Sequence, residues 1–264
     1  MSRTIPIPPA ERAALDWIAR VGAADAASLA LHLDRAESTA AGRLRSLRAA
    51  GLVQDLTLIA GGPPLWRATA VGLRRVARAG LPVCRVSAGS AAHVRGCAEL
   101  AAVLEQRHPD HVVLTERELI AVQRGRRGEP PLCGPVLEMG VAGRPRTHRP
   151  DLVLWPREGG DPVAIELELT VKAPARLQEL CRAWARCREV AGVVYYASGP
   201  AERALCRAVS AVRAEEAVVV VPLGAVLASG HERKTSQARR TVRRAFKPTE
   251  GGSACRTPAS TASP

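Results

Sequence analysis

The chain has 264 residues, of which 25 are acidic and 38 are Lys or Arg, so its formal net charge is +13. A hydrophobic content of 47% is ordinary for a globular protein and excludes a wholly disordered basic protein. The length allows one large domain or two small ones, and we expect two. The positive charge predicts a polyanionic partner.

Apolar stretches and cysteines indicate the cellular compartment of the protein. The longest apolar stretch, residues 217–227, is interrupted by Pro222 and Gly224 and falls short of the ~20 residues that cross a bilayer. Prolines near the N-terminus argue against a secretory signal, so we expect a cytoplasmic location without a membrane partner. The seven cysteines include no CxxC pair, which favours reduced thiols over disulfides or a zinc ribbon.

The positive charge is unevenly distributed along the chain. The net charge is +5 over residues 1–80, +2 over 81–230 and +6 over 231–264. Two basic ends therefore flank a nearly neutral middle with many carboxylates, which is one way to build a DNA-handling protein with an acidic metal site. A general bias toward Arg, with solvated charged faces, is the alternative explanation.

Residues 9–79 contain the capping and turn residues expected of three helices, two strands and a last helix. Pro9 suits the start of the first helix, and Asp25 suits the N-cap of the second. Ser38 or Thr39 can cap the third helix, with Gly51 just past its end. The residues expected to face inward are Leu15, Ile18, Leu29, Leu33, Leu44 and Leu47. The expected strands are Val53–Ile59 and Leu65–Thr69, separated by GGPP, and the last helix is Ala70–Ala79.

This order resembles the helix-turn-helix of the winged-helix family. On the third helix Thr39, Arg43 and Ser46 fall at i, i+4 and i+7, away from the apolar face. Such a stripe is typical of a recognition helix in the major groove, and Arg45 and Arg48 are placed for phosphate contacts. Winged helices also serve as protein-interaction modules, and this alternative stays open.

The middle segment holds the candidate chemistry. After a connector over 81–90 we expect a helix over Ala91–Arg107 and a short strand over Val112–Leu114. Leu152–Trp155 and Val163–Val171 are strand-like and separated by turn residues, which predicts a β-hairpin. A turn centred between Gly159 and Gly160 places Asp151 opposite Glu168 and Val153 opposite Glu166.

Three carboxylates then converge, because residues 166, 168, 170 and 172 share one face of a strand. Asp151, Glu166 and Glu168 would repel one another without a cation, and their hard oxygen atoms favour Mg²⁺ or Mn²⁺. Such an ion can activate water for phosphodiester hydrolysis. Lys172 adds a charge that can stabilise the developing phosphorane oxyanion.

Lys172 is the only lysine among the first 233 residues of a chain that otherwise uses arginine. Lysine differs from arginine in being a compact, titratable ammonium, which suggests that this position requires one. A chance lysine at the exposed end of a strand is the alternative.

At Pro150, Asp151 and Glu166 the sequence resembles the PD-(D/E)xK nuclease superfamily. The resemblance implies a restriction-endonuclease-like fold, an α/β sandwich with a central mixed sheet and a metal-dependent phosphodiesterase site. Where the superfamily usually has Lys two residues after the second acid, this chain has Glu168, and its lysine lies at 172.

The segments TEREL, HRPDLVL and ELELTVK, together with the winged-helix pattern, are similar to the replication-relaxation family of plasmids and other mobile elements. The likeness spans roughly residues 10–225. It implies a helix-turn-helix in front of a nuclease-like domain that acts in replication or mobilisation. By the same likeness, Glu116 contributes an acidic residue to the metal site.

The C-terminal part continues the α/β pattern and ends in a basic tail. Expected elements are a helix over Ala175–Glu189, a strand over Val193–Ala197, a helix over Ala201–Val212 and a strand over Val218–Val221. His108 and His111, in HPDH, are predicted to be loop histidines because Pro109 separates them. Arginines of the tail are expected to bind DNA non-specifically: Arg239, Arg240, Arg243 and Arg244.

The fold class expected from these patterns is α+β. A winged helix-turn-helix domain (1–80) and a linker (81–90) precede a restriction-endonuclease-like domain (91–230) and a basic tail (231–264). The leading hypothesis is a DNA-binding protein of a mobile element with a magnesium-dependent nuclease site. The alternative is a non-catalytic regulator or partner-recruiting protein that keeps the fold. A homodimer, or association with other replication or mobilisation proteins, is compatible with the sequence.

Overall fold

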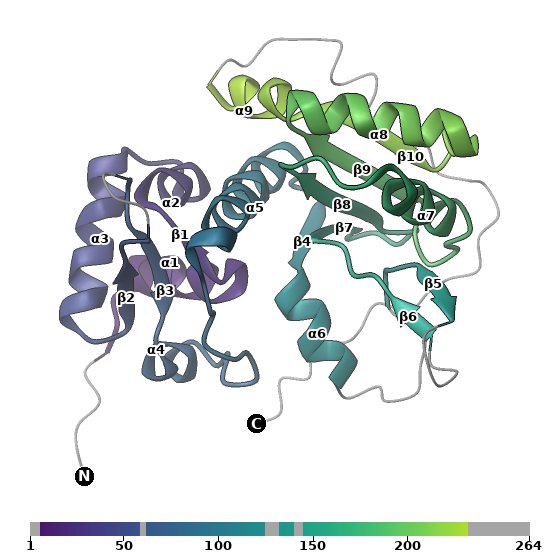
Figure 1. Cartoon of the computed structure of the whole chain (residues 1–264). Helices are drawn as coiled ribbons and strands as arrows, with labels where there is room; N and C mark the ends of the chain where they lie inside the picture. Colours follow the sequence, from purple (N-terminus) through teal and green to yellow (C-terminus); the bar gives the residue numbers. More distant parts are fainter. Residues whose placement is uncertain (1–5, 59–61, 125–131, 140–144, 232–264) are drawn as a thin grey trace. The chain divides into compact units, whose positions relative to one another are not determined.

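The computed structural model describes residues 6–58, 62–124, 132–139 and 145–231 (Figure 1). The chain divides into two compact units. The N-terminal unit comprises Met1–Arg107 and Thr115–Glu129, and the C-terminal unit comprises His108–Leu114 and Pro130–Pro264. The fold is α+β, as expected, and each unit has its own β-sheet.

The N-terminal unit starts with a helix, a very short strand, two helices and a hairpin. These elements are α1 (Pro9–Val21), β1 (Ala23–Ala24), α2 (Ala26–Leu33), α3 (Glu37–Ala49), β2 (Val53–Leu56), β3 (Leu65–Ala68) and α4 (Ala70–Arg75). The three strands form an antiparallel sheet in the order β1-β3-β2. The tip of the hairpin, residues 59–61, lies outside the described residues.

The expected starts of the first two helices are confirmed. Pro9 opens α1, and the carboxylate of Asp25 accepts a hydrogen bond from the Ser28 N–H at 2.8 Å, capping α2. The expected cap of α3 is wrong: Ala36 is the N-cap residue, and Ser38 lies inside the helix. Glu37 fills the first turn instead, where its negative charge suits the helix dipole.

The core of this unit is formed by the apolar faces of its helices. Leu15, Ile18, Leu29, Leu44 and Leu47 are fully or almost fully buried, as the helical spacing predicts. Leu33 is half-buried and packs against the same core.

Two further helices, α5 (Ala88–Arg107) and α6 (Glu116–Arg124), belong to the N-terminal unit. The sequence pattern placed the domain boundary before these two helices, at the 81–90 connector. The structure differs because Ala98 and Ala102 of α5 are buried in the same core as Leu29 of α2. Small alanine side chains on that face allow the two helices to approach closely.

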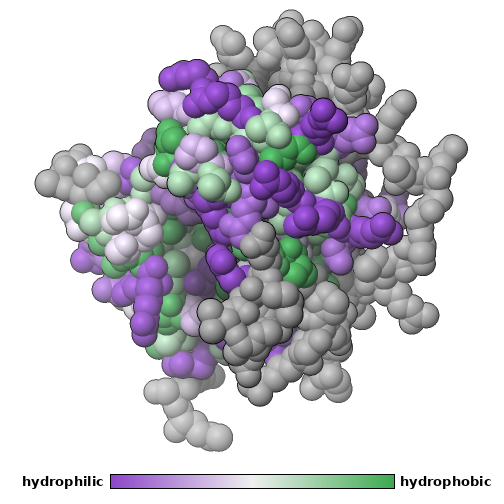
Figure 2. Space-filling view, turned by 45° about the vertical axis from the view of Figure 1, so that its right-hand side comes forward, coloured by the Kyte–Doolittle hydropathy of each residue, from purple (hydrophilic) through white to green (hydrophobic). Residues whose placement is uncertain are grey.

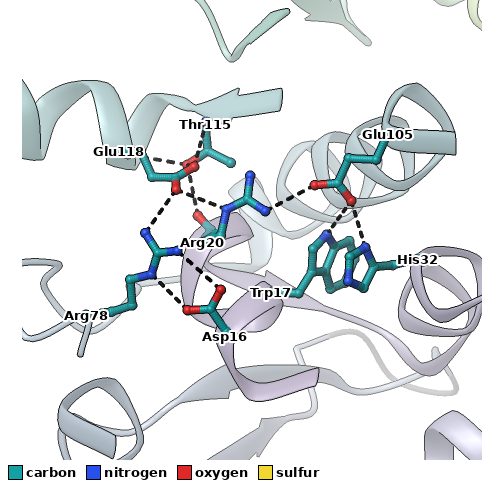
Figure 3. Close-up of polar contacts among 8 residues, drawn as sticks. All are labelled: Asp16, Trp17, Arg20, His32, Arg78, Glu105, Thr115 and Glu118. Carbon is teal, nitrogen blue, oxygen red and sulfur yellow. Dashed lines mark hydrogen bonds and ion pairs between the residues drawn. The ribbon is translucent and has the colours of Figure 1, made fainter. Parts of the chain in front are cut away.

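A polar network ties these later helices to α1 and α2 (Figure 3). At the start of α6 the Glu118 N–H donates to Thr115 Oγ1 at 3.3 Å, and Glu118 Oε2 accepts from the Thr115 N–H at 3.1 Å. This reciprocal pair is a capping box. Arg20 and Arg78 both donate to the other oxygen of Glu118, at 3.0 and 3.4 Å.

The same network continues to α5 through Glu105. Arg20 also donates to Glu105 Oε1 at 3.2 Å, while Trp17 Nε1 donates to Glu105 Oε2 at 3.1 Å. His32 Nδ1 lies 2.7 Å from Glu105 Oε2, and its ring stacks on Trp17. Glu105 and Glu118 therefore join four helices of the N-terminal unit through charge-assisted hydrogen bonds (Figure 3).

The C-terminal unit contains a five-stranded sheet in the order β10-β9-β8-β7-β4. Its elements are β4 (His111–Thr115, the last residue of which is grouped with the other unit), β5 (Val136–Met139), β6 (Pro145–Thr147), β7 (Leu152–Pro156), β8 (Val163–Glu168), α7 (Pro174–Ala185), β9 (Gly192–Ala197), α8 (Gly199–Val212), β10 (Val218–Pro222) and α9 (Leu223–His231). Strand β8 pairs antiparallel with β7 and parallel with β9, so the expected mixed sheet is confirmed.

The sheet is covered by helices that connect its parallel strands. Helices α7 and α8 pack against each other and against β9 and β10 (Figure 1). All six residues of β8 are buried, which is typical of a central strand. The predicted strand over Val193–Ala197 is confirmed, and the predicted helix over Ala201–Val212 begins slightly earlier, at Gly199.

The surface is mixed in character. On the face seen in Figure 2, hydrophilic side chains are interspersed among apolar ones. Large hydrophobic side chains exposed in the described ranges are valines 71, 122, 136 and 171. No helix within those ranges has the length and apolar character needed to cross a membrane. The six cysteines described are free thiols, as the sequence predicts.

Candidate functional site

The candidate site lies where strands β7 and β8 pair. Leu152 pairs with Ile165, and Val153 pairs with Ala164. One step further, the same register brings Asp151 opposite Glu166, so the predicted pairing of Asp151 with Glu168 is wrong by two residues. The pattern of buried residues could not detect this error, because a shift of two residues leaves every side chain on its own face.

Each of the three expected carboxylates has a partner in the C-terminal unit. Glu166 Oε1 lies 2.6 Å from His148 Nε2, and Glu168 Oε2 lies 2.5 Å from Lys172 Nζ. Asp151 Oδ2 accepts a hydrogen bond from the Leu167 N–H at 2.8 Å. The charge compensation that the sequence analysis assigned to a divalent ion is thus partly supplied by the side chains of His148 and Lys172.

Burial makes the electrostatics of the two glutamates unusual. Glu166 and Glu168 are only 5% and 4% exposed. Burial raises the pKa of Glu166 to about 7, an effect that the charge of Asp151 increases and the hydrogen bond with His148 reduces. Burial by itself lowers the pKa of His148, but the bond to Glu166 and the charges of Glu166 and Asp151 outweigh it, so this pKa is raised. The protonation of Glu166 and that of His148 therefore depend on each other.

His148 is the site residue to which the sequence analysis gave no role. It stands between β6 and β7 in irregular backbone, where neither the helix nor the strand period applies. Its N–H donates to the Pro135 carbonyl at 3.0 Å. Gly134 makes this approach possible, because a Cβ there would lie 2.1 Å from the His148 carbonyl oxygen. The only sequence signal was the place of His148 within HRPDLVL.

Aromatic residues surround the His148–Glu166 pair. The rings of His148 and Trp184 meet edge to face, with centroids 6.0 Å apart. Trp184 Nε1 donates to the Tyr195 hydroxyl at 3.1 Å, and Tyr195 is the β9 residue in register with Glu166. Burial and the nearby charge of Glu166 raise the pKa of Tyr195 well above its usual value. Trp184 and Tyr195 are each only 1% exposed, so these aromatic side chains are part of the core beside the pair.

Lys172 reaches the site by a different route from the one expected. Strand β8 ends at Glu168, so residues 170 and 172 do not continue its face, and this expectation is wrong. At the end of the strand, the Ser198 N–H donates to the Glu168 carbonyl at 3.0 Å and the Ser198 hydroxyl donates to the Leu169 carbonyl at 2.9 Å. Lys172 lies in the connection to α7 and folds back onto Glu168, with 43% of its side chain exposed.

The fit of this site to a divalent ion rests on its donor chemistry. Three carboxylates offer the hard oxygen ligands that Mg²⁺ prefers. A cation bound to both glutamates must displace His148 and Lys172 from them. Within the described part of the C-terminal unit, the ligand atoms of Asp151, Glu166 and Glu168 do not all lie within 4.8 Å of one another, whereas those of His108, Asp110 and His111 do.

Glu116, expected from the resemblance to contribute to the metal site, is the first residue of α6. That helix, including Glu116, is grouped with the N-terminal unit.

The proposed DNA-contacting residues of the N-terminal unit are side chains of α3. Thr39, Arg45, Ser46 and Arg48 are exposed and Arg43 is half-buried, while Leu44 faces the core. Arg48 Nε lies 3.1 Å from Asp55 Oδ1 of β2. The tail arginines, Arg239, Arg240, Arg243 and Arg244, lie outside the described residues.

A scan against protein-family models and a search of curated proteins find no match to this chain.

Proposed function

We propose that the chain is a DNA-binding protein of a plasmid or other mobile element that acts in replication or mobilisation. We propose further that its C-terminal unit is a metal-dependent phosphodiesterase with a restriction-endonuclease-like fold. The observation that carries the proposal is the group formed by Asp151, Glu166, Glu168, His148 and Lys172, where strand β7 begins and strand β8 ends.

The N-terminal unit supports the DNA-binding part of the proposal. Its order of helix, strand, two helices and hairpin, with a β1-β3-β2 sheet, is the order of a winged helix. In that arrangement α3 is the recognition helix. Arg45 and Arg48 are then available for phosphates, and Thr39, Arg43 and Ser46 for base edges.

The C-terminal unit supports the catalytic part. A bound Mg²⁺ would polarise the scissile phosphate and activate a water molecule. Asp151, Glu166 and Glu168 are the residues that would hold it. His148, which hydrogen-bonds Glu166, would be displaced from it by the ion and would then be available to accept the proton released from water. The partly exposed ammonium of Lys172 is available to a phosphate oxygen.

A second function follows if the site is not catalytic. His148 and Lys172 already compensate Glu166 and Glu168, so the unit can fold with its buried carboxylates satisfied and no ion bound. The chain would then bind DNA through α3 and recruit other proteins without cleaving the duplex.

One assay separates the two functions. The full-length protein is incubated with supercoiled plasmid and Mg²⁺ or Mn²⁺, and Asp151→Asn and Glu168→Gln are compared with wild type. Asp161→Asn is the matched control, because Asp161 is an exposed carboxylate in the connection between the same two strands. We expect wild type and the control to nick the plasmid and the two site variants to lose at least about a hundredfold in rate. Binding of DNA without any nicking by the wild type would favour the non-catalytic function.

A further inference from the structure

We infer that His108, Asp110 and His111 form a second metal site, which takes a transition ion of the zinc class. It does not depend on the function proposed above. The three residues lie in the C-terminal unit, at the turn that leads into β4, the edge strand of the five-stranded sheet.

The geometry of the turn brings the ligand atoms together. One ligand atom from each of His108, Asp110 and His111 lies within 4.8 Å of the other two. His111 Nδ1 is 3.0 Å from Asp110 Oδ1, and the two imidazole rings meet edge to face with centroids 5.6 Å apart. Ligands bound at about 2.0–2.2 Å to one ion lie roughly 3–3.5 Å from each other, so a shift of about 1 Å completes the site.

The backbone that carries these side chains is held in place. The His111 N–H donates to the His108 carbonyl at 2.9 Å, which closes the turn around Pro109. Arg157, just after β7, donates its N–H to the Asp110 carbonyl at 3.0 Å and its Nε to the Pro109 carbonyl at 3.3 Å. The turn is therefore tied to a neighbouring strand end, which reduces the entropy lost when an ion binds.

The ligand types select the ion. Two imidazole nitrogens and one carboxylate suit Zn²⁺, Co²⁺ or Ni²⁺, whereas Mg²⁺ prefers oxygen ligands alone. Asp110 is 72% exposed at its side chain, which leaves the remaining coordination positions open to water.

The test is calorimetric titration of the full-length, reduced protein with ZnCl₂. We expect a Zn²⁺ site that weakens at least tenfold in His108→Ala and His111→Ala, and on the order of tenfold in Asp110→Asn. Two controls are expected to match wild type: Asp161→Asn, which alters an exposed carboxylate, and Cys206→Ala, which removes an exposed thiol. MgCl₂ is expected not to compete.

Unchanged Zn²⁺ affinity in the double variant His108→Ala/His111→Ala would overturn the inference, as would absence of Zn²⁺ binding by the wild type. The side chain of His111 is only 12% exposed, so Asp110→Asn takes the place of the double variant if the latter does not fold. In that case equal affinities of Asp110→Asn and Asp161→Asn would refute the site, and a selective loss in Asp110→Asn would support it.

Discussion

The imidazole of His148 lies 2.6 Å from the carboxylate of Glu166, and Glu166 is only 5% exposed. The pKa values of two titratable groups in contact depend on the surrounding protein wherever that protein replaces water. This pair joins the irregular segment before β7 to the central strand β8. The same pair therefore contributes both to the folding of the C-terminal unit and to the chemistry proposed for it.

The pair predicts how stability depends on pH. Folding raises the pKa of Glu166 from 4.5 to about 7 and also raises that of His148, so the folded state binds protons more tightly than the unfolded state. The free energy of unfolding should then fall as the pH rises from about 4.5 to about 7, by at most about 3 kcal/mol for Glu166. Urea denaturation between pH 5 and 8 measures this slope.

The variant Glu166→Gln should reverse the slope. It leaves the half-buried His148 without its charged partner, so burial lowers the pKa of His148 and stability rises with pH. The exposed-site variant Glu216→Gln should keep the wild-type slope. Equal slopes in Glu166→Gln and wild type would show that the pair does not titrate as described.

Lys172→Gln should slow plasmid nicking by about ten- to a hundredfold if the proposed nuclease activity is correct, because it removes the ammonium near Glu168. Lys172→Arg keeps the charge but not the compact shape and should recover only part of the rate. Stability should fall as well, because Glu168 is only 4% exposed and loses its charged partner. Single-turnover rates at saturating DNA measure the effect, and a wild-type rate in Lys172→Gln would remove this lysine from the mechanism.

Arg45→Ala should weaken DNA binding severalfold and reduce the salt dependence of affinity by about one counterion. The reason is that Arg45 is an exposed side chain of α3, available to a phosphate group. Arg12→Ala on α1 is the matched control, because Arg12 is equally exposed but lies on another helix. Fluorescence anisotropy over a range of NaCl concentrations gives both slopes, and identical slopes for the two variants would argue against α3 as the contact helix.

Glu118→Ala should destabilise the N-terminal unit by about 2–4 kcal/mol. It removes one half of the capping box with Thr115 and the shared acceptor of Arg20 and Arg78 (Figure 3). Thermal unfolding measures the loss. Glu215→Ala, at an exposed carboxylate in a turn, should leave the melting temperature within experimental error. A similar small change in Glu118→Ala would mean that the network contributes little.

Gly134→Ala should cost about 1–3 kcal/mol, because the added Cβ would meet the His148 carbonyl oxygen at 2.1 Å and force the backbone apart. The displaced His148 should also flatten the pH dependence described above. Gly224→Ala is the control: its Cβ meets no atom within 4 Å and the position is helical, so it should be neutral or slightly stabilising. Chemical denaturation of the two variants compares them directly.

The sequence by itself determined the elements that rest on local patterns. The helices that begin at Pro9 and after Asp25, the inward faces with Leu44 and Leu47, and the buried strand over Val193–Ala197 follow from capping chemistry and periodicity. These signals act over a few residues, so no knowledge of the rest of the chain is needed to interpret them.

Only the tertiary structure decided the register of β7 against β8 and the partners of the carboxylates. A shift of two residues keeps the same buried face, so the pairing of Asp151 beside Glu166 depends on the whole hairpin and its connection. His148 comes from irregular backbone whose position Gly134 permits, and the helix α5 joins the N-terminal core through contacts with α2 far away in sequence. Such contacts between distant residues leave no local period, and this is the physical reason why they had to be found in the folded chain.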